Sequence, residues 1–284
     1  METTPKIQTP GFYPDVPRAD YDAIEAINFS TIKHAARSLA HYRHSLDNPT
    51  SQTPAMALGQ AVHLAVFEPA EFRGSVIVEP DVDGRTKEGE AARAAFAAAS
   101  AGKTVIQHDD VHTINSMASA IQAHGTAATL LALPRRNEAT AVWTDPATGL
   151  LCKARMDAWI DDGIVCDLKT TQDARPSAFS RTIAQYQYHL QAAIYLEAIR
   201  RTLGIEASFV WIAVESSAPH GVAVYEAAPD TLGEGEHIRA QLMAAVASAR
   251  KTGKYPGYQD NVIEIGIPAW AMTSGGLSMV GGEA

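Results

Sequence analysis

The sequence is short of cysteine, of basic charge and of long apolar runs, and each shortage excludes a class of protein. The two cysteines of the 284-residue chain, Cys152 and Cys166, cannot supply a disulfide scaffold, an iron–sulfur cluster or a structural zinc site. The 23 Lys and Arg are outnumbered by 32 Asp and Glu, so any DNA contact has to be local. No run reaches the ~18 apolar residues of a membrane span, and Met1–Thr9 lack a signal-peptide core. We therefore expect a soluble, cytoplasmic protein that does not interact with membranes.

Hydrophobic residues make up 46% of the chain, which is enough for a sizeable buried core. No internal repeat and no linker divides the sequence. We expect an extended, proline-rich arm at 1–27, a single domain at 28–270 and a flexible tail at 271–284, with disorder over 2–17 and 274–284.

Hydrophobic periodicity predicts a helical N-terminal half, followed by a half in which strands and helices mix. The expected helices cover 31–45, 55–67, 90–100, 109–133, 176–203 with a break near Ala184, and 230–251. The expected strands cover 138–146, 150–160, 164–170, 209–214 and 222–227. This order indicates an α/β (α+β) fold, in which a mixed central sheet is flanked by helices and the helical half wraps around it.

Three segments of the N-terminal half carry groups that could bind a ligand. The helix at 31–45, with Ser30 as its expected N-cap, has a basic, histidine-rich face: Lys33, His34, Arg37, His41, Arg43 and His44. This face either is simply solvated or contacts phosphates. The helix at 55–67 is apolar nearly all round and should be buried, and His63 within it is either a core histidine or a ligand. Arg85 and Lys87, in a polar loop, could touch a phosphate backbone.

The strands at 150–160 and 164–170 flank Asp161-Asp162-Gly163, which predicts a β-hairpin. Even positions of both strands are apolar, whereas the odd positions are largely charged. We expect the even positions to face a core and the odd positions to form a charged face. A three-residue loop with Gly163 in the left-handed conformation pairs residue 160 with 164. The same register places 157 opposite 167 and 155 opposite 169.

This register brings the carboxylates of Asp157 and Asp167 together, with Lys169 beside them on the same face. Like charges directly opposite each other destabilise a sheet unless something intervenes. A divalent cation would turn the repulsion into binding, and the lysine could then orient a water or stabilise charge on a phosphate. The alternative is a solvated sheet face with ordinary cross-strand ion pairs.

The hairpin with Asp157 and Asp167-Leu168-Lys169, followed by a helix, resembles the PD-(D/E)XK nuclease superfamily, although Met156 stands where that name has proline. Further motifs are similar to exodeoxyribonuclease VIII-like prophage recombination exonucleases, which share RecB-type nuclease motifs. They are Gly59-x-x-x-His63 on a helix, the run from Trp143 to Asp157 with Glu138 upstream, and Gln191-x-x-x-Tyr195 after the hairpin. The resemblance covers about residues 20–270.

The resemblance implies a restriction-endonuclease-like core and a role for each motif residue. The cation would be held by His63, Asp157, Asp167 and the main-chain carbonyl of Leu168, and Lys169 would position the nucleophile. Gln191 and Tyr195 either pack the helix, contact the substrate strand or support the ligands. Glu138 is either a surface acid or a group that binds metal through water or a second ion.

The resemblance also implies an activity. It points to a Mg²⁺-dependent exonuclease that digests one strand of linear double-stranded DNA from the 5′ end, leaving 3′ single strands for phage-type recombination. Mn²⁺ should substitute for Mg²⁺, whereas Ca²⁺ should bind without turnover. The implied partners are further copies in a toroidal homo-oligomer, a trimer or tetramer, and a phage single-strand annealing protein. The alternatives are an endonuclease or single-strand nuclease of the same fold, and a catalytically silent DNA-binding or assembly subunit.

Overall fold

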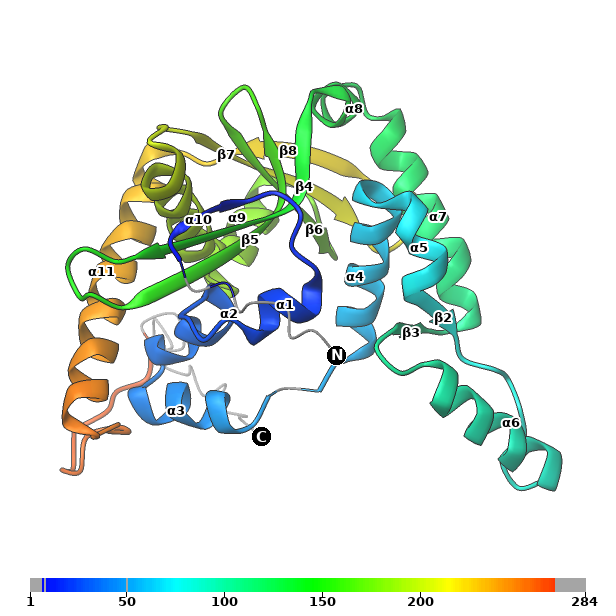
Figure 1. Ribbon diagram of the computed structural model, residues 1–284, viewed down its shortest axis with the longest axis horizontal. Coiled ribbons are helices and arrows are strands. Elements are labelled where there is room, and N and C mark those ends of the chain that lie inside the picture. The colour runs from blue at the N-terminus through cyan, green and yellow to red at the C-terminus, as the bar shows by residue number, and fades with distance from the viewer. Residues whose placement is uncertain (1–6, 8, 50, 269–284) are drawn as a thin grey trace, which may run out of the picture.

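A six-stranded mixed sheet forms the centre of the computed structural model, which describes residues 7, 9–49 and 51–268 (Figure 1). The strands lie in the order β1 (Gly11–Tyr13), β4 (Arg135–Thr144), β5 (Leu151–Ile160), β6 (Ile164–Thr171), β7 (Ser208–Glu215) and β8 (Val222–Glu226). β6 and β7 run parallel, and the other neighbours are antiparallel. Helices flank this sheet, so the predicted mixed α/β fold is confirmed.

Helices cover both faces of the sheet, and each face has its own apolar cluster. One cluster joins Trp211 and Met156 of the sheet to α10 (Tyr188–Leu203), α9 (Pro176–Gln185) and α11 (Pro229–Thr252). The other joins Ile212 and Leu168 to α4 (Pro54–Phe67), α7 (His108–Ala123) and α8 (Gly125–Ala132). Strands buried on both faces are apolar at nearly every position, as β7 is.

From residue 9 onward the N-terminal segment has a defined conformation, which corrects the expectation of an extended arm with disorder through residue 17. Residues 11–13 form β1, which pairs with β4, and α1 (Arg18–Ala23) follows. Val16, Tyr21 and Ile24 are buried in a small cluster against the sheet. Prolines hide this docking from periodicity analysis because the segment is too irregular to show a repeat. The predicted tail at 271–284 lies outside the described residues.

Several predicted helices are found with different boundaries. The 31–45 segment is divided into α2 (Phe29–Ile32), a 3-10 turn (Lys33–Ala36) and α3 (Leu39–Asp47). Ser30 is not the cap, because Asn28 accepts the hydrogen bond from the Thr31 N–H, and Ser38 caps α3. The 109–133 helix is split into α7 and α8, and the expected break in 176–203 falls between α9 and α10, at Gln187, whose φ is +59°.

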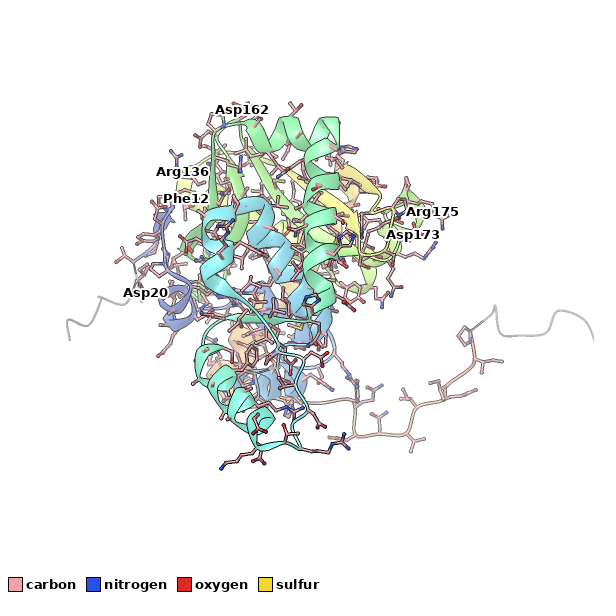
Figure 2. All side chains as sticks on the ribbon, turned by 90° about the vertical axis from the view of Figure 1, so that its right-hand side faces the viewer. Phe12, Asp20, Arg136, Asp162, Asp173 and Arg175 are labelled. Atoms are coloured by element: carbon pink, nitrogen blue, oxygen red, sulfur yellow. The ribbon has the colours of Figure 1, made fainter. Side chains whose placement is uncertain are left out.

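A small projection carries the predicted polar loop, which ends at Thr86 because α6 already begins at Lys87. Strands β2 (Val76–Val78) and β3 (Thr104–Ile106), which the sequence did not predict, form a two-stranded parallel sheet after α5 (Pro69–Ser75). Between them, the loop and α6 (Lys87–Ala99) extend away from the body of the molecule (Figures 1 and 2). Within the described ranges, none of the helices combines the length and apolar content needed to cross a bilayer.

Candidate active site

The β5–β6 hairpin opens at the position where the two aspartates were expected to pair. Its turn is as predicted, since Ile160 pairs with Ile164 and Gly163 has a φ of +86°. Pairing stops at Ala158 and Cys166, so the expected pairs 157–167 and 155–169 are not formed. Beyond this point β6 stays paired with β7 as far as residue 171. The Asp157 carboxylate occupies the opening, where its Oδ2 accepts a 2.8 Å hydrogen bond from the Leu168 N–H.

The strict alternation of an apolar and a charged face also fails at Asp157. Ala154 and Met156 belong to the same apolar cluster as Trp159, whereas Ala158 belongs to the cluster on the opposite side of the sheet. β5 therefore changes faces in the middle. In β4, Glu138 lies across from Asp157, between two paired positions, and has a left-handed backbone with a φ of +51°. Because of these two irregularities, the carboxylates of Asp157 and Glu138 lie close together.

His63 on α4 touches both the Asp157 side chain and the main chain of β6. Its Nε2 lies 2.7 Å from the Leu168 carbonyl oxygen, and its Nδ1 lies 3.2 Å from Asp157 Oδ2. A carbonyl only accepts, so Nε2 carries a proton, and a neutral ring then presents its Nδ1 lone pair to a carboxylate. This contact is favourable only with a proton on one of the two groups or with a cation between them.

The electrostatics of Asp157 point the same way. Burial, partly opposed by His63 and reinforced by Asp167, raises the pKa of Asp157 to about 7. Ligand atoms of His63, Glu138 and Asp157 all lie within 4.8 Å of one another. Imidazole nitrogen, carboxylate oxygen and a nearby carbonyl oxygen form a donor set that suits a hard divalent cation. The arrangement fits such an ion, although this grouping contains Glu138 where the sequence led us to expect Asp167.

Asp167 is fully buried and contacts two of the predicted residues, Gln191 and Lys169, while the third, Tyr195, contacts Gln191. Gln191 Nε2 donates to Asp167 Oδ1 at 2.9 Å and lies 3.1 Å from the Tyr195 hydroxyl, while Lys169 Nζ lies 2.5 Å from Asp167 Oδ2. The Lys169 ammonium also sits 4.7 Å from the ring centre of Tyr188. Burial lowers the pKa of Lys169, but the charges of Asp167 and Asp157 outweigh it, so that pKa is raised overall. Lys169 is therefore a cation at neutral pH.

Glu138 has a partner that sequence analysis did not assign to the site. Arg155 Nε lies 2.5 Å from Glu138 Oε2, and another guanidinium nitrogen of Arg155 donates to the Val16 carbonyl at 2.6 Å. Lys153, two residues earlier on β5, is buried and donates to the carbonyls of Tyr21 and Ile24. The two basic side chains thus fasten the N-terminal segment beside the carboxylates. Their positions at every second residue before Asp157 on β5 are the signal that could have identified them.

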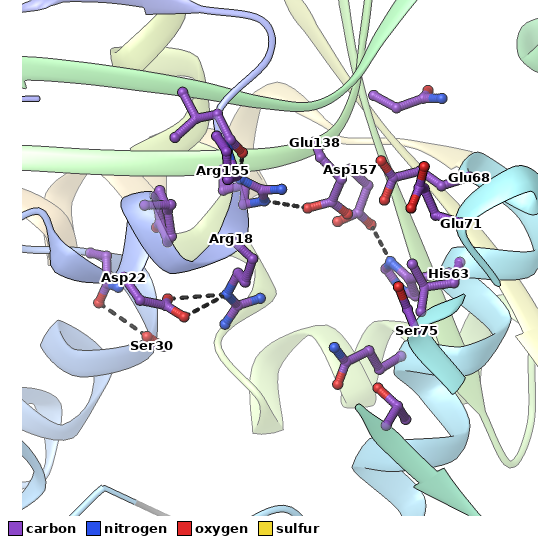
Figure 3. A pocket seen from close by; sticks show the side chains of 18 of the residues that line it. Arg18, Asp22, Ser30, His63, Glu68, Glu71, Ser75, Glu138, Arg155 and Asp157 are labelled. Carbon is purple, nitrogen blue, oxygen red and sulfur yellow. Dashed lines mark hydrogen bonds and ion pairs between the residues drawn. The ribbon is translucent and has the colours of Figure 1, made fainter. Parts of the chain in front are cut away.

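An open groove of about 930 Å³ has His63, Glu138, Arg155 and Asp157 on its floor, whereas Asp167, Lys169 and Gln191 do not line it. One wall is the N-terminal segment from Pro14 to Ser30, and the other consists of α4 and α5, which contribute Glu68 and Glu71 (Figure 3). The face of α4 with His63 lines this groove, so α4 is not buried all round as predicted. Burial and the neighbouring Glu138 raise the pKa of Glu68. Carboxylates therefore line the groove on its floor and on one wall. Their negative charge has to be offset by positive charge before a phosphate can approach.

The remaining predicted residues lie elsewhere or at the margin. Arg85 is almost fully exposed on the projection and pairs with Asp83, and neither Arg85 nor Lys87 lines the groove. Of the basic segment, Lys33 comes near enough to the site for burial and the charge of Lys169 to lower its pKa. Arg37 and Arg43 pair instead with Tyr258 and Asp47.

Comparisons with known proteins agree with this fold. A family model described as a PDDEXK-like domain of unknown function, DUF3799, matches residues 28–263. The chain is similar to a crystal structure from Eubacterium rectale with a provisional exonuclease assignment, with a TM-score of 0.61, 14% identity, and coverage of 92% of this chain and 99% of that one. A crystal structure of SSO0001 covers 78% of this chain and 87% of its own at 13% identity, but its TM-score of 0.29 supports no argument. No curated protein matches the chain.

Proposed function

Because the chain belongs to the DUF3799 family of PDDEXK-like domains, we propose that it is a Mg²⁺-dependent exodeoxyribonuclease. In this proposal it degrades one strand of linear double-stranded DNA from the 5′ end and leaves 3′ single strands for recombination. The exonuclease assignment of the Eubacterium rectale structure and the motif resemblance to exodeoxyribonuclease VIII support the choice of an exonuclease. The same resemblance supports a toroidal homo-oligomer of three or four copies and a phage annealing protein as partner.

The observation that carries the proposal is the opening of the hairpin at Asp157. A sheet with a solvated charged face has no reason to break its ladder there, yet the break places the Asp157 carboxylate against His63 and the Leu168 main chain. Two buried carboxylates lie next to a lysine that stays charged. Such a cluster is destabilising by itself, and it becomes useful when a divalent ion is bound.

In this mechanism His63, Asp157, Asp167 and the Leu168 carbonyl would hold the ion, and Glu138 would assist them. When bound, the divalent ion supplies an acidified water and neutralises charge on the scissile phosphate. The Lys169 ammonium can only donate hydrogen bonds, so it orients the attacking water or stabilises charge on the phosphate oxygens. Gln191 and Tyr195 fix the rotamer of Asp167, since the Gln191 amide bonds to both.

The test is digestion of linear duplex DNA labelled at the 5′ or the 3′ end, with Mg²⁺ or EDTA. We expect Mg²⁺-dependent release of the 5′ label, no cleavage of closed circles, and a loss of about 10²–10³-fold in rate in Lys169→Ala. Lys251→Ala, a change at an exposed lysine of α11 that does not line the groove, is the matched control. Cleavage of circles would show an endonuclease on the same site. No cleavage with any divalent metal would overturn catalysis in favour of a DNA-binding subunit.

A further inference from the structure

The chain leaves the body after α11 and then exposes an apolar segment that the site does not use. Residues 253–258 are anchored, since the Ala40 N–H donates to the Pro256 carbonyl at 3.0 Å and Arg37 Nε donates to the Tyr258 hydroxyl at 2.8 Å. From there the C-terminal arm, residues 259–268, runs away from the molecule, as the extended trace at the right of Figure 2 shows.

The arm has the pattern of a β-strand without a sheet. Isoleucines recur at every second position, at Ile263, Ile265 and Ile267, and Glu264 is the only charged residue between them. Val262 is 99% exposed, Ile265 is 88% exposed and Ile267 is 62% exposed. Alternating β-branched residues favour a strand, and so large an apolar surface on an extended segment indicates a contact that is missing in the isolated chain.

The same chain offers a strand edge that such an arm can fill. β8 lies at the end of the six-stranded sheet, and no strand among the described residues pairs with its outer side. Its sequence, Val-Ala-Val-Tyr-Glu, has no proline or lysine, and its one charge is at the end. Natural edge strands are usually protected by such residues because free N–H and C=O groups attract another strand. β1, the opposite edge, has only three residues.

The arm cannot reach β8 of its own chain. The 24 residues of α11 separate the end of β8 from the start of the arm, and a helix of that length spans about 36 Å. The anchors at Pro256 and Tyr258 hold the chain near α3, at the far end of α11 from β8 (Figure 1). The nine residues from Tyr258 to Ile267, the last isoleucine of the arm, extend at most about 32 Å, which is less than the length of α11.

We propose that the C-terminal arm of one copy adds as a strand to the β8 edge of a second copy of this chain. Main-chain hydrogen bonds extend the sheet, and the isoleucines bury their side chains against the neighbour. Arm and edge are different surfaces, so the contact is head-to-tail, and such contacts close into rings when the rotation allows. This inference concerns assembly and does not depend on the proposed nuclease activity.

The experiment measures assembly of the full chain without DNA or metal. Light scattering on the wild type should give a multiple of the 30.3 kDa monomer mass. Ile265→Asp should weaken association about tenfold or more, because it places a charge in a buried strand contact. Ile205→Asp, the same change at an exposed isoleucine elsewhere, is the matched control. Hydrogen exchange of the Val222–Glu226 peptide should be slow in the wild type and faster in Ile265→Asp.

Three results would overturn the proposal. They are a wild type that is monomeric at all concentrations, an assembly that Ile265→Asp leaves unchanged, and β8 exchange that does not depend on the arm. Hydrolysis of short DNA, measured in parallel, reports on the nuclease proposal. If the wild type does not hydrolyse DNA, the nuclease proposal is refuted, whereas the assembly proposal is unaffected.

Discussion

The Asp157 carboxylate accepts a 2.8 Å hydrogen bond from the Leu168 N–H, just beyond the point where β5 and β6 stop pairing. Where this hydrogen bond forms, β5 and β6 are no longer paired, so the hairpin opens. The opening lets His63 reach the Leu168 carbonyl from α4, and it separates Asp157 from Asp167 so that each has its own set of partners. The acidic pair is thus arranged by side-chain to main-chain bonding and not by cross-strand register.

Asp157 should make the metal-free protein less stable as the pH rises. Its folded-state pKa of about 7 lies above the value of about 3.9 for an unfolded chain. The folded state therefore binds the extra proton, and its contribution to stability is lost as pH rises from about 4 to about 7. In EDTA, the Tm advantage of Asp157→Asn over wild type should grow across that window by several degrees, at about 2–4 °C per kcal/mol. A constant difference across this pH range would contradict the raised pKa.

A divalent cation should reverse this effect. Because the ion binds the folded site and not the unfolded chain, Mg²⁺, Mn²⁺ or Ca²⁺ should raise Tm, by about 2.7 kcal/mol of stabilisation at 100 times the dissociation constant. The increase should disappear in Asp157→Asn and shrink in Glu138→Gln, whose side chain contributes to the same grouping. Asp162→Asn, at the exposed hairpin turn that Figure 2 labels, should keep the full shift. Thermal melts with equal concentrations of each chloride salt measure all four, and an unaltered shift in Asp157→Asn would exclude this residue as a ligand.

The central sheet and its hairpin could be predicted because their signals are local. Alternation over the two strands, together with Gly163, fixed the turn and the pairing of Ile160 with Ile164. The pairing of 157 with 167 could not be corrected from the sequence, because the competing hydrogen bond joins a side chain to a main-chain group eleven residues away. Gln191 and Tyr195 were named through the family resemblance, and the structure brings the Gln191 amide to both Asp167 and the Tyr195 hydroxyl.

The groove walls could not be predicted because they depend on long-range contacts. The irregular segment from Pro14 to Ser30 has no periodicity, and its place is set by Lys153 and Arg155, more than 120 residues away. Buried lysines are rare, and alternation assigned Lys153 to the charged face and not to a buried position. Only the structure shows that three main-chain carbonyls surround its ammonium group.

The left-handed backbone of Glu138 predicts that glycine is tolerated better than alanine at this position. A φ of +51° is unfavourable for a residue with a Cβ atom and neutral for glycine. Glu138→Gly should therefore be more stable than Glu138→Ala by about 1 kcal/mol, while both lose the carboxylate and lose activity to the same extent. Chemical denaturation and end-labelled digestion of the two variants provide the comparison. If the alanine variant is as stable as the glycine variant, the left-handed backbone is not strained.

Lys153 should control the N-terminal wall of the groove more than the chemistry on its floor. Its ammonium lies 2.7, 2.9 and 3.3 Å from the carbonyl oxygens of Tyr21, Ile24 and Asp22. Lys153→Met keeps the length of the side chain but leaves these buried acceptors unpaired, at a cost of about 1–3 kcal/mol. The segment containing α1 should then become the first site of limited proteolysis, and substrate binding should weaken more than kcat falls. Lys251→Met, at an exposed lysine that does not line the groove, should change neither. Unchanged protection of α1 in Lys153→Met would mean that β1 and the buried Val16, Tyr21 and Ile24 hold the wall without the lysine.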